Sequence, residues 1–409
     1  MIKEQLKEAK KACRFMQNVK PEVKNKALKN ISEALIQKSE LIIQENQKDI
    51  AAAKNNGIKE SMVDRLLLNE ERIEAMAKDI LKVIDLQDPI GTLVREIKRP
   101  NGLVIQQIRI PLGVIGVIYE SRPNVTVDIA SLCIKTNNVC VLKGGKEAIH
   151  SNRILVQIIN EAIQDVLPAH TVTLIETKKR EETLDLIQAH DYVDVIIPRG
   201  SAGLIQYVVK NATVPVIETG AGICHLYVDQ EASLDMALEI AKNAKIQRPS
   251  VCNAIETILV HQKVAPEFLP KLKEIFKNVQ IYGDEKTRKI IDCLKATKKN
   301  YATEYDDYIC NIKVVDDIEE AIEHIYNYST KHSESIITEN KETAKYFMES
   351  LDSACVYHNA STRFSDGGEF GFGAEVGIST QKLHARGPLG LQEITSTKYM
   401  IYGNGQVRS

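Results

Sequence analysis

The sequence predicts an α/β protein built on mainly parallel sheets with helices on both faces. Short apolar segments rich in β-branched residues alternate with helical stretches between residues 113 and 218. Strands that alternate with helices of this length form parallel sheets. The 409 residues also exceed the length at which a single core stops growing. We therefore expect two or three domains, each with a core of its own.

The first ninety residues predict amphipathic helices. Between residues 23 and 57, apolar residues recur at i, i+3 and i+4, and the pattern stops at Gly57. The segment 99–118 instead alternates apolar and polar residues, with a turn at Asn101–Gly102 and a break at Pro111. This segment predicts a β-hairpin that protrudes.

The remaining elements form two α/β segments. The second begins near residue 229, carries Cys252 and runs to about 375, and the tail at 395–409 predicts a short strand. Parallel sheets bind ligands at the carboxyl ends of their strands, so we expect site residues in the loops there. The strands predicted in the first segment are "GVIGVIY", "VCVLKG", "VTLIE", "VDVIIPR" and "VPVIE".

Composition excludes several classes of protein. The net charge of −2 gives no electrostatic reason to expect nucleic acid as a partner. The N-terminus is charged throughout, and no apolar run is long enough to span a bilayer. The eight cysteines show no CxxC pair and no metal-ligand spacing, which favours buried thiols over a disulfide framework or a zinc site. We expect a cytosolic protein that acts on small molecules or on other proteins.

Two glycine-containing loops follow predicted strands. In "VLKGGKEAIHSN", Lys143 and Lys146 flank two glycines that allow a ligand to approach the backbone, and a solvated turn is an equal alternative. In "PRGSAGL", Gly200 and Ser201 open a helix whose free N–H groups suit a pyrophosphate, and a simple N-cap role for Ser201 is as common. The dinucleotide fingerprint GxGxxG is absent.

A carboxylate and a thiol complete the local candidates. Glu218 follows the strand "VPVIE" and precedes two glycines, where an acid or a base can act; a capping or surface role is as common. Cys252, in "QRPSVCNAIETILV", lies at the junction of a turn and an apolar run, and is a nucleophile or a buried thiol. His225 is left unassigned, since most such histidines belong to the core.

Taken in order, the motifs carry a resemblance. The series "PLGVIGVIYESRPNVT", "VLKGGK", "RGSAGL", "VIETGAG", "QRPSVCNAIE" and "STQKLHARGPLGL" resembles the aldehyde dehydrogenase superfamily, and in particular its γ-glutamyl phosphate reductase branch. The match covers nearly the whole chain, and the last two motifs are specific to that branch. The resemblance implies an aldehyde-dehydrogenase-like fold: a Rossmann-type cofactor domain, an α/β catalytic domain and a small β oligomerisation arm.

The resemblance also implies catalytic roles. The family's nucleophile falls on Cys252, between a turn and an expected helix N-terminus with Arg248 four residues earlier, which favours a thiolate. The oxyanion is held by the cysteine's own N–H and by an asparagine amide, for which Asn124 in "ESRPNVT" is the candidate. Glu218 matches the base of hydrolytic members, but this branch must not hydrolyse its thioester, which leaves geometry or proton handling for Glu218.

Cofactor and substrate roles carry over in the same way. Lys143 matches the lysine on the adenosine ribose, and Lys146 replaces a glutamate of NAD-preferring members, which favours the 2′-phosphate of NADPH. Glu304 aligns with the glutamate on the nicotinamide ribose, and a surface acid is the equal alternative. Gly200 and Ser201 match the pyrophosphate loop. Cations in the branch-specific motifs suit a phosphate and a carboxylate, although each could be an ordinary surface charge or a salt bridge: Arg248, Arg363, Lys382, His384 and Arg386.

The implied organisation has three parts. Residues 1–98 and 113–228, with 376–390 returning, form the NADP(H)-binding domain; 229–375 form the catalytic domain; and 99–112 with 391–409 form the oligomerisation arm. A homo-oligomer, dimer or tetramer, is expected. The implied activity is NADPH-dependent reduction of L-glutamyl 5-phosphate to L-glutamate 5-semialdehyde in proline biosynthesis. The alternatives are a coenzyme A-linked acylating dehydrogenase and a catalytically silent scaffold partner of glutamate kinase. Glutamate kinase is also a possible physical partner of an active reductase.

Overall fold

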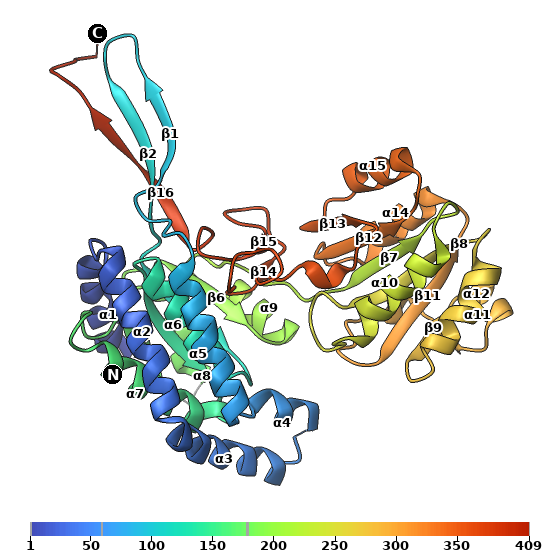
Figure 1. Cartoon of the computed structure of the whole chain (residues 1–409), viewed down its shortest axis with the longest axis horizontal. Coiled ribbons are helices and arrows are strands. Elements are labelled where there is room, and N and C mark those ends of the chain that lie inside the picture. The colour runs from blue at the N-terminus through green and yellow to red at the C-terminus, as the bar shows by residue number, and fades with distance from the viewer. Residues whose placement is uncertain (1, 59, 177–179, 409) are drawn as a thin grey trace. The chain divides into compact units, whose positions relative to one another are not determined.

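The structure, a computed structural model, describes residues 2–58, 60–176 and 180–408, and the chain divides into two compact units (Figure 1). Unit 1 comprises Met1–Thr219, Gly371–Gly377 and Leu389–Ser409, and unit 2 comprises Gly220–Phe370 and Ile378–Pro388. Among the helices within the described ranges, none has the length and apolar character that crossing a membrane requires.

Unit 1 is built on a parallel sheet with the strand order β5-β4-β3-β6. All six residues of β3 are buried, as expected for a strand covered on both faces. The strands are β3 (Val114–Tyr119), β4 (Val139–Gly144), β5 (Val172–Leu174) and β6 (Val195–Arg199). The helices that alternate with them are α6 (Asn124–Lys135), η1 (Lys146–Ala148), α7 (Ile149–Ile163), α8 (Arg180–Ile187) and α9 (Ala202–Asn211).

The N-terminal helices pack on this sheet and on its helices. They are α1 (Ile2–Met16), α2 (Pro21–Gln37), α3 (Ser39–Asn55), α4 (Glu60–Leu66) and α5 (Glu70–Asp85). The side chains of Leu6, Ala9 and Met16 form one apolar stripe of α1, which lies on β3, β4 and β5. Helix α3 ends just before Gly57, whose φ of +66° suits glycine. The predicted amphipathic helices are therefore present.

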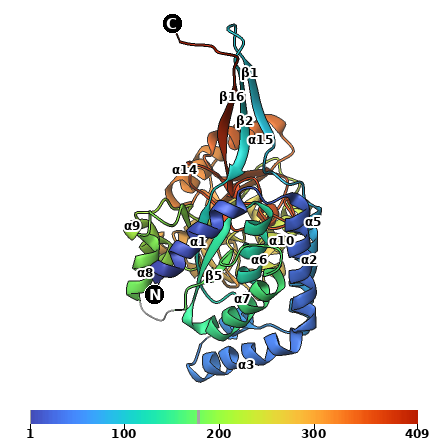
Figure 2. The same cartoon turned by 90° about the vertical axis from the view of Figure 1, so that its left-hand side faces the viewer.

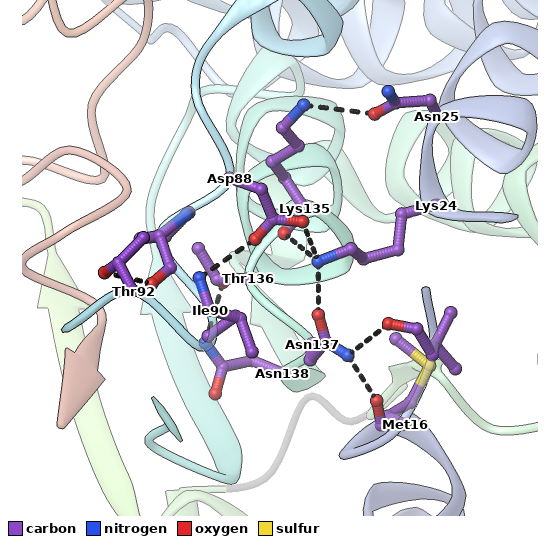
Figure 3. A network of polar contacts seen from close by, with 12 residues as sticks. Met16, Lys24, Asn25, Asp88, Ile90, Thr92, Lys135, Thr136, Asn137 and Asn138 are labelled. Atoms are coloured by element: carbon purple, nitrogen blue, oxygen red, sulfur yellow. Dashed lines mark hydrogen bonds and ion pairs between the residues drawn. The ribbon is translucent and has the colours of Figure 1, made fainter. Parts of the chain in front are cut away.

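A buried polar network joins α2 to the loop after α5 and to the turn between α6 and β4 (Figure 3). Lys24 is 1% exposed, and its Nζ lies 2.5 Å from Asp88 Oδ2. The same ammonium donates to the Lys135 carbonyl at 2.9 Å and to Asn137 Oδ1. Burial lowers the pKa of Lys24, and the hydrogen bond with Asp88 opposes this shift. Three segments distant in the sequence are thus held by one buried ion pair.

The arm is a three-stranded antiparallel sheet that projects from the helices and parallel sheet of unit 1 (Figures 1 and 2). Its strands are β1 (Leu93–Lys98), β2 (Val104–Pro111) and β16 (Thr395–Tyr402), in the order β1-β2-β16. The hairpin closes where Arg99 N–H donates to the Leu103 carbonyl at 2.8 Å, with Gly102 at a φ of +90°. The predicted hairpin and the predicted C-terminal strand are confirmed, and they pair with each other.

Unit 2 is built on a seven-stranded parallel sheet with the order β10-β9-β11-β8-β7-β12-β13. Its strands are β7 (Cys224–Val228), β8 (Ile255–His261), β9 (Gln280–Gly283), β10 (Leu294–Lys295), β11 (Ile309–Val315), β12 (Ser333–Ile337) and β13 (Cys355–His358). Its helices are α10 (Leu234–Ile246), α11 (Ala265–Ile275), α12 (Glu285–Ile290), α13 (Lys298–Tyr301), α14 (Ile318–Tyr328), α15 (Lys341–Ser350) and η2 (Thr362–Phe364). Strands β14 (Ile378–Ser379) and β15 (Gly387–Pro388) form a separate antiparallel pair.

Three expectations are corrected. The segment "VPVIE" forms a single bridge, Ile196 to Val216, instead of a strand. No helix begins at Cys252: a turn leads directly into β8, because "IETILVH" is rich in β-branched residues and completely buried. The chain passes from unit 1 to unit 2 at 219/220, so β7 lies in unit 2, as does 378–388, while β1 pairs with β2 in the arm. The separation of these parts follows strand pairing, which residue patterns do not reveal.

Candidate functional site

Cys252 lies in the turn before β8 and is one of two half-buried cysteines among eight, all in the described ranges; the other is Cys293. The Cys252 carbonyl accepts a hydrogen bond from Cys224 Sγ at 3.2 Å. A Cβ atom at Gly222 would stand 1.4 Å from the same carbonyl oxygen. Only glycine fits there, so the close approach of two backbone segments positions the accessible thiol.

Arg363 reaches the same turn from η2. Its guanidinium donates to Asn253 Oδ1 and, through Nε, to Gln247 Oε1 at 3.1 Å. Asn253 Nδ2 in turn donates to the Arg363 carbonyl at 3.2 Å. Burial lowers the pKa of Arg363, and the charges of Asp366 and Cys252 oppose that effect. A cation therefore lies within electrostatic range of the thiol, held by Asn253, which the residue pattern had not singled out although it directly follows the cysteine.

Two other predicted residues belong to this neighbourhood. Arg248 is exposed and acts electrostatically on the Arg363 guanidinium, so it lies near the same group. Glu304 is half-buried, and its Oε1 accepts a hydrogen bond from the Gly222 N–H at 2.7 Å. Glu304 is therefore attached to the glycine that contacts the Cys252 turn and is not an isolated surface acid.

The remaining predicted cations lie in the loop between β14 and β15. Lys382 Nζ and Arg386 Nη1 each lie 2.8 Å from a carboxylate oxygen of Asp352. Hydrogen bonds from Lys382 and then Arg386 lower the pKa of Asp352. His384 is exposed and adopts a φ of +72°. Asp352 was not predicted, and its ion pairs fix the loop that carries these cations.

In unit 1, the two predicted lysines lie at the carboxyl end of β4 (Lys143) and just after it (Lys146). Lys143 is half-buried, and burial lowers its pKa against the opposing charges of Glu147 and Glu120. Lys146 is exposed in η1. Glu147 Oε1 accepts hydrogen bonds from the N–H of Ser121 at 2.7 Å and from its hydroxyl at 2.9 Å. The carboxyl ends of β3 and β4 thus present two lysines and two carboxylates beside each other.

The loop before α9 is the second predicted ligand loop. Ser201 is the N-cap of α9, and its Oγ accepts from the Leu204 N–H at 3.4 Å. The Ser201 N–H donates to Glu120 Oε2 at 2.8 Å, and a Cβ at Gly200 would stand 2.5 Å from that oxygen. A carboxylate therefore contacts the N–H group expected to meet an anion. Glu120 was missed, although its place directly after a buried strand was a usable signal.

Asn124 and Glu218 also lie in unit 1. Asn124 is the exposed first residue of α6, and its amide donates to Asp128 Oδ2 at 3.0 Å. Burial raises the pKa of Asp128 to about 7, and the hydrogen bond from Asn124 opposes this shift. Glu218 is half-buried two residues after the Val216 bridge. The predicted site residues are thus divided between the units, with Cys252, Glu304 and the five cations predicted to bind substrate anions in unit 2.

Comparison with known proteins covers the full length. Residues 1–309 match the aldehyde dehydrogenase family. The chain is 53% identical to the gamma-glutamyl phosphate reductase of Halothermothrix orenii, over 100% of this chain and 99% of that protein. It is 55% identical to the protein of that name from Petrotoga mobilis, over 98% of this chain and 97% of the relative.

Solved structures agree with these relatives. The crystal structure of gamma-glutamyl phosphate reductase from Thermotoga maritima superimposes with a TM-score of 0.96 at 48% identity, covering 99% of each chain. An acetylating aldehyde dehydrogenase from Geobacillus thermoglucosidasius shares the fold, with a TM-score of 0.72 at 16% identity, covering 100% of this chain and 97% of that one. The aldehyde-dehydrogenase-like fold predicted from the sequence is confirmed.

Proposed function

Because this chain belongs to the aldehyde dehydrogenase family, and within it to the γ-glutamyl phosphate reductases, we propose that it reduces L-glutamyl 5-phosphate to L-glutamate 5-semialdehyde and phosphate. NADPH is the reductant, and the reaction is a step of proline biosynthesis. The observation that carries this assignment is the similarity to γ-glutamyl phosphate reductases over the full length of the chain. In addition, the branch-specific turn holds the half-buried thiol of Cys252 within electrostatic range of Arg363.

Cys252 is the proposed nucleophile. Its thiolate attacks the acyl carbon, the bond from that carbon to the phosphate oxygen breaks, and a thioester links the acyl group to Sγ. NADPH, when bound, supplies the hydride that reduces this thioester. The aldehyde then leaves, and Sγ returns to the thiolate. Arg363 is the proposed stabiliser of that thiolate because it lies within electrostatic range and Asn253 holds it in place.

The oxyanion formed at each addition needs donors. The backbone N–H of Cys252 and the amide of Asn124 are the proposed donors. The hydrogen bond from Asn124 to Asp128 Oδ2 leaves the second amide hydrogen available to an oxyanion. Glu218 has no hydrolytic part in this proposal, since water must not reach the thioester; its proposed role is geometry or proton handling.

Substrate anions require cations. Arg248 and Arg363 are the leading candidates for the phosphate and the α-carboxylate, because both lie near Cys252. Lys382 and Arg386 are bound to Asp352, and we propose that they, with His384, shape the loop and contact the substrate only at its edge. This ranks the five predicted cations, which the sequence had left equal.

The residues present fit a phosphorylated dinucleotide. Lys143 lies at the carboxyl end of β4 and Lys146 follows that strand, and Gly200 allows the backbone before α9 to approach a ligand closely. The Ser201 N–H donates to the Glu120 carboxylate, which is the kind of contact that a pyrophosphate oxygen would make in its place. In the proposal, Lys143 holds the adenosine ribose, Lys146 the 2′-phosphate, Gly200 and Ser201 the pyrophosphate, and Glu304 the nicotinamide ribose.

The proposal includes assembly through the arm. An edge strand exposes unpaired backbone groups that readily pair with another chain. Apolar side chains are exposed on both outer strands of the arm: Leu93, Val94, Tyr399, Ile401 and Tyr402. A homo-oligomer, dimer or tetramer, covers them. Contact with glutamate kinase, which makes the substrate, stays a prediction.

The reverse reaction tests the activity. Glutamate 5-semialdehyde and NADP⁺ are incubated with and without inorganic phosphate, using wild type, Cys252→Ala and, as the matched control, Cys293→Ala. We expect NADPH formation that depends on phosphate, disappears in Cys252→Ala and persists in Cys293→Ala. Activity that needs coenzyme A in place of phosphate, or that needs neither, would assign a different acyl acceptor, and full activity in Cys252→Ala would remove the nucleophile from the proposal.

A further inference from the structure

Unit 2 contains a pocket that the proposed reaction does not use. Its volume is about 490 Å³. Its lining comes from α12, β10, α13, β11 and α14, together with the residues between β10 and α13. All lining residues lie between residues 284 and 328, which the structure describes. None of them is a candidate residue for the reductase reaction. The pocket lies beside the carboxyl ends of β9 and β10, where open α/β sheets bind ligands.

The pocket carries an excess of positive charge. Arg288, Lys295 and Lys298 line it, and among the described residues none of the three forms an ion pair with a carboxylate. The acidic lining residues are already engaged. Asp284 accepts the Thr287 N–H at 2.9 Å, and Glu285 lies 3.0 Å from Lys289 Nζ. Four cationic and two acidic side chains line the pocket, and this excess of positive charge suits a dianion better than a single carboxylate.

Two buried polar groups provide an independent sign of a ligand. Tyr301 is 9% exposed and His324 is 4% exposed, and both line the pocket. Neither Tyr301 Oη nor His324 Nε2 has a hydrogen-bond partner among the described protein atoms. A buried polar atom without a partner costs free energy unless another group satisfies it. A ligand oxygen in the pocket would do so.

The floor of the pocket is aromatic and uncharged. The rings of Tyr301 and His324 are perpendicular with centroids 4.8 Å apart, and the Tyr328 ring lies 4.7 Å from His324 and 5.5 Å from Tyr301. Burial lowers the pKa of His324 to about 2, so the imidazole is neutral and has one N–H to donate. Flat rings next to cations accept a ligand with an apolar or aromatic body and an anionic head.

We propose that this pocket binds a small phosphate monoester. The phosphate contacts Arg288, Lys295 and Lys298, and the organic part lies against Tyr301, Tyr328 and His324. This site is separate from the Cys252 turn and is independent of the proposed reductase activity.

A local fluorescent probe tests the proposal. The chain contains no tryptophan, so Tyr328→Trp places the sole tryptophan in the pocket. Tyr326→Trp is the matched control, because Tyr326 lies on the same helix, is 57% exposed and does not line the pocket. Each variant is titrated with phenyl phosphate, and with phenol as the uncharged analogue. We expect a saturable change with phenyl phosphate in Tyr328→Trp alone.

Charge variants assign the binding groups. Arg288→Gln with Lys298→Gln, added to Tyr328→Trp, should weaken phenyl phosphate binding about tenfold or more. Lys271→Gln with Lys277→Gln changes the charge of unit 2 equally outside the pocket and should leave binding unchanged. Equal binding in both double variants, or equal responses to phenol and phenyl phosphate, would overturn the proposal.

Calorimetry covers the case in which Tyr328→Trp does not fold. Phenyl phosphate is titrated into the otherwise unmodified chain and into Arg288→Gln with Lys298→Gln. The proposal requires phenyl phosphate to bind about tenfold or more weakly to the double variant, and an unchanged affinity would contradict it.

Discussion

At the scale of residues, Gly222 decides where the Cys252 turn lies. A methyl group there would overlap the Cys252 carbonyl oxygen, whereas a Cβ at Gly203 meets nothing within 4 Å. We expect Gly222→Ala to displace the turn and to lower kcat about 100-fold, as a shift of roughly 1 Å at a reacting group does. Gly203→Ala should keep normal kcat. Steady-state kinetics measures kcat, and thermal melts show whether each variant is folded. A normal kcat in Gly222→Ala would contradict the role of Gly222 in placing the Cys252 turn.

Lys146 predicts a cofactor effect. Its exposed ammonium follows β4, where a positive charge favours the 2′-phosphate of NADPH and a carboxylate favours ribose hydroxyls. Lys146→Glu should therefore lower the ratio of kcat/KM for NADPH to that for NADH by about tenfold or more. Lys210→Glu, an equal charge change at the end of α9, is the control. If both variants keep the wild-type ratio, Lys146 does not contact the 2′-phosphate.

Asp128 predicts a pH dependence of stability. Burial raises the pKa of its carboxyl from 3.8 to about 7. Because the folded-state pKa exceeds the unfolded one, the stabilising contribution is complete below about pH 4 and is lost as the pH rises through about 7. The variant Asp128→Asn has no carboxyl that titrates at this position. We expect the free energy of unfolding of wild type, relative to Asp128→Asn, to fall between about pH 5 and about pH 8 in urea titrations. A constant difference would show that Asp128 titrates normally.

At the scale of elements, the buried ion pair between Lys24 and Asp88 fastens α2 to the loop that enters the arm. Removing one member of such a pair leaves an uncompensated buried charge. Asp88→Ala should therefore lower the free energy of unfolding by about 3 kcal/mol or more. Glu33→Ala removes the partner of Lys29 in an exposed pair on the same helix, and should change it by less than about 0.5 kcal/mol. Equal losses in denaturant titrations would mean that burial of the pair is irrelevant.

At the scale of the whole molecule, the exposed apolar residues of the arm predict self-association. Tyr399 and Ile401 are 59% and 61% exposed on one strand, two residues apart and hence on one face. Tyr399→Lys with Ile401→Lys should at least halve the mass measured by light scattering after gel filtration. Tyr326→Lys with Met348→Lys, which alters exposed apolar residues of unit 2, should not. An unchanged mass in the arm variant would place the interface elsewhere.

The sequence predicted these parts unequally. The helices of residues 2–85, the hairpin and the parallel strands were readable because period and turn residues act locally. "VPVIE" and the helix expected at Cys252 failed because both depend on neighbours: β6 offers one bridge to the first, and complete burial makes the second a strand. Asp352 and Asn253 gained their contacts only through folding, so motif matching could not assign them.

The order of strands in the arm has a consequence for synthesis. Strands β1 and β2 are made before residues 220–388, but β16, which covers the second edge of β2, is made after them. Translation of residues 220–388 takes roughly ten to thirty seconds at usual rates. During this time the edge of β2 that later pairs with β16 has no partner strand. A hairpin alone is marginally stable in water. The arm is therefore completed only after residues 220–388 have been made, so shorter nascent chains on one messenger RNA lack the complete arm with which to pair.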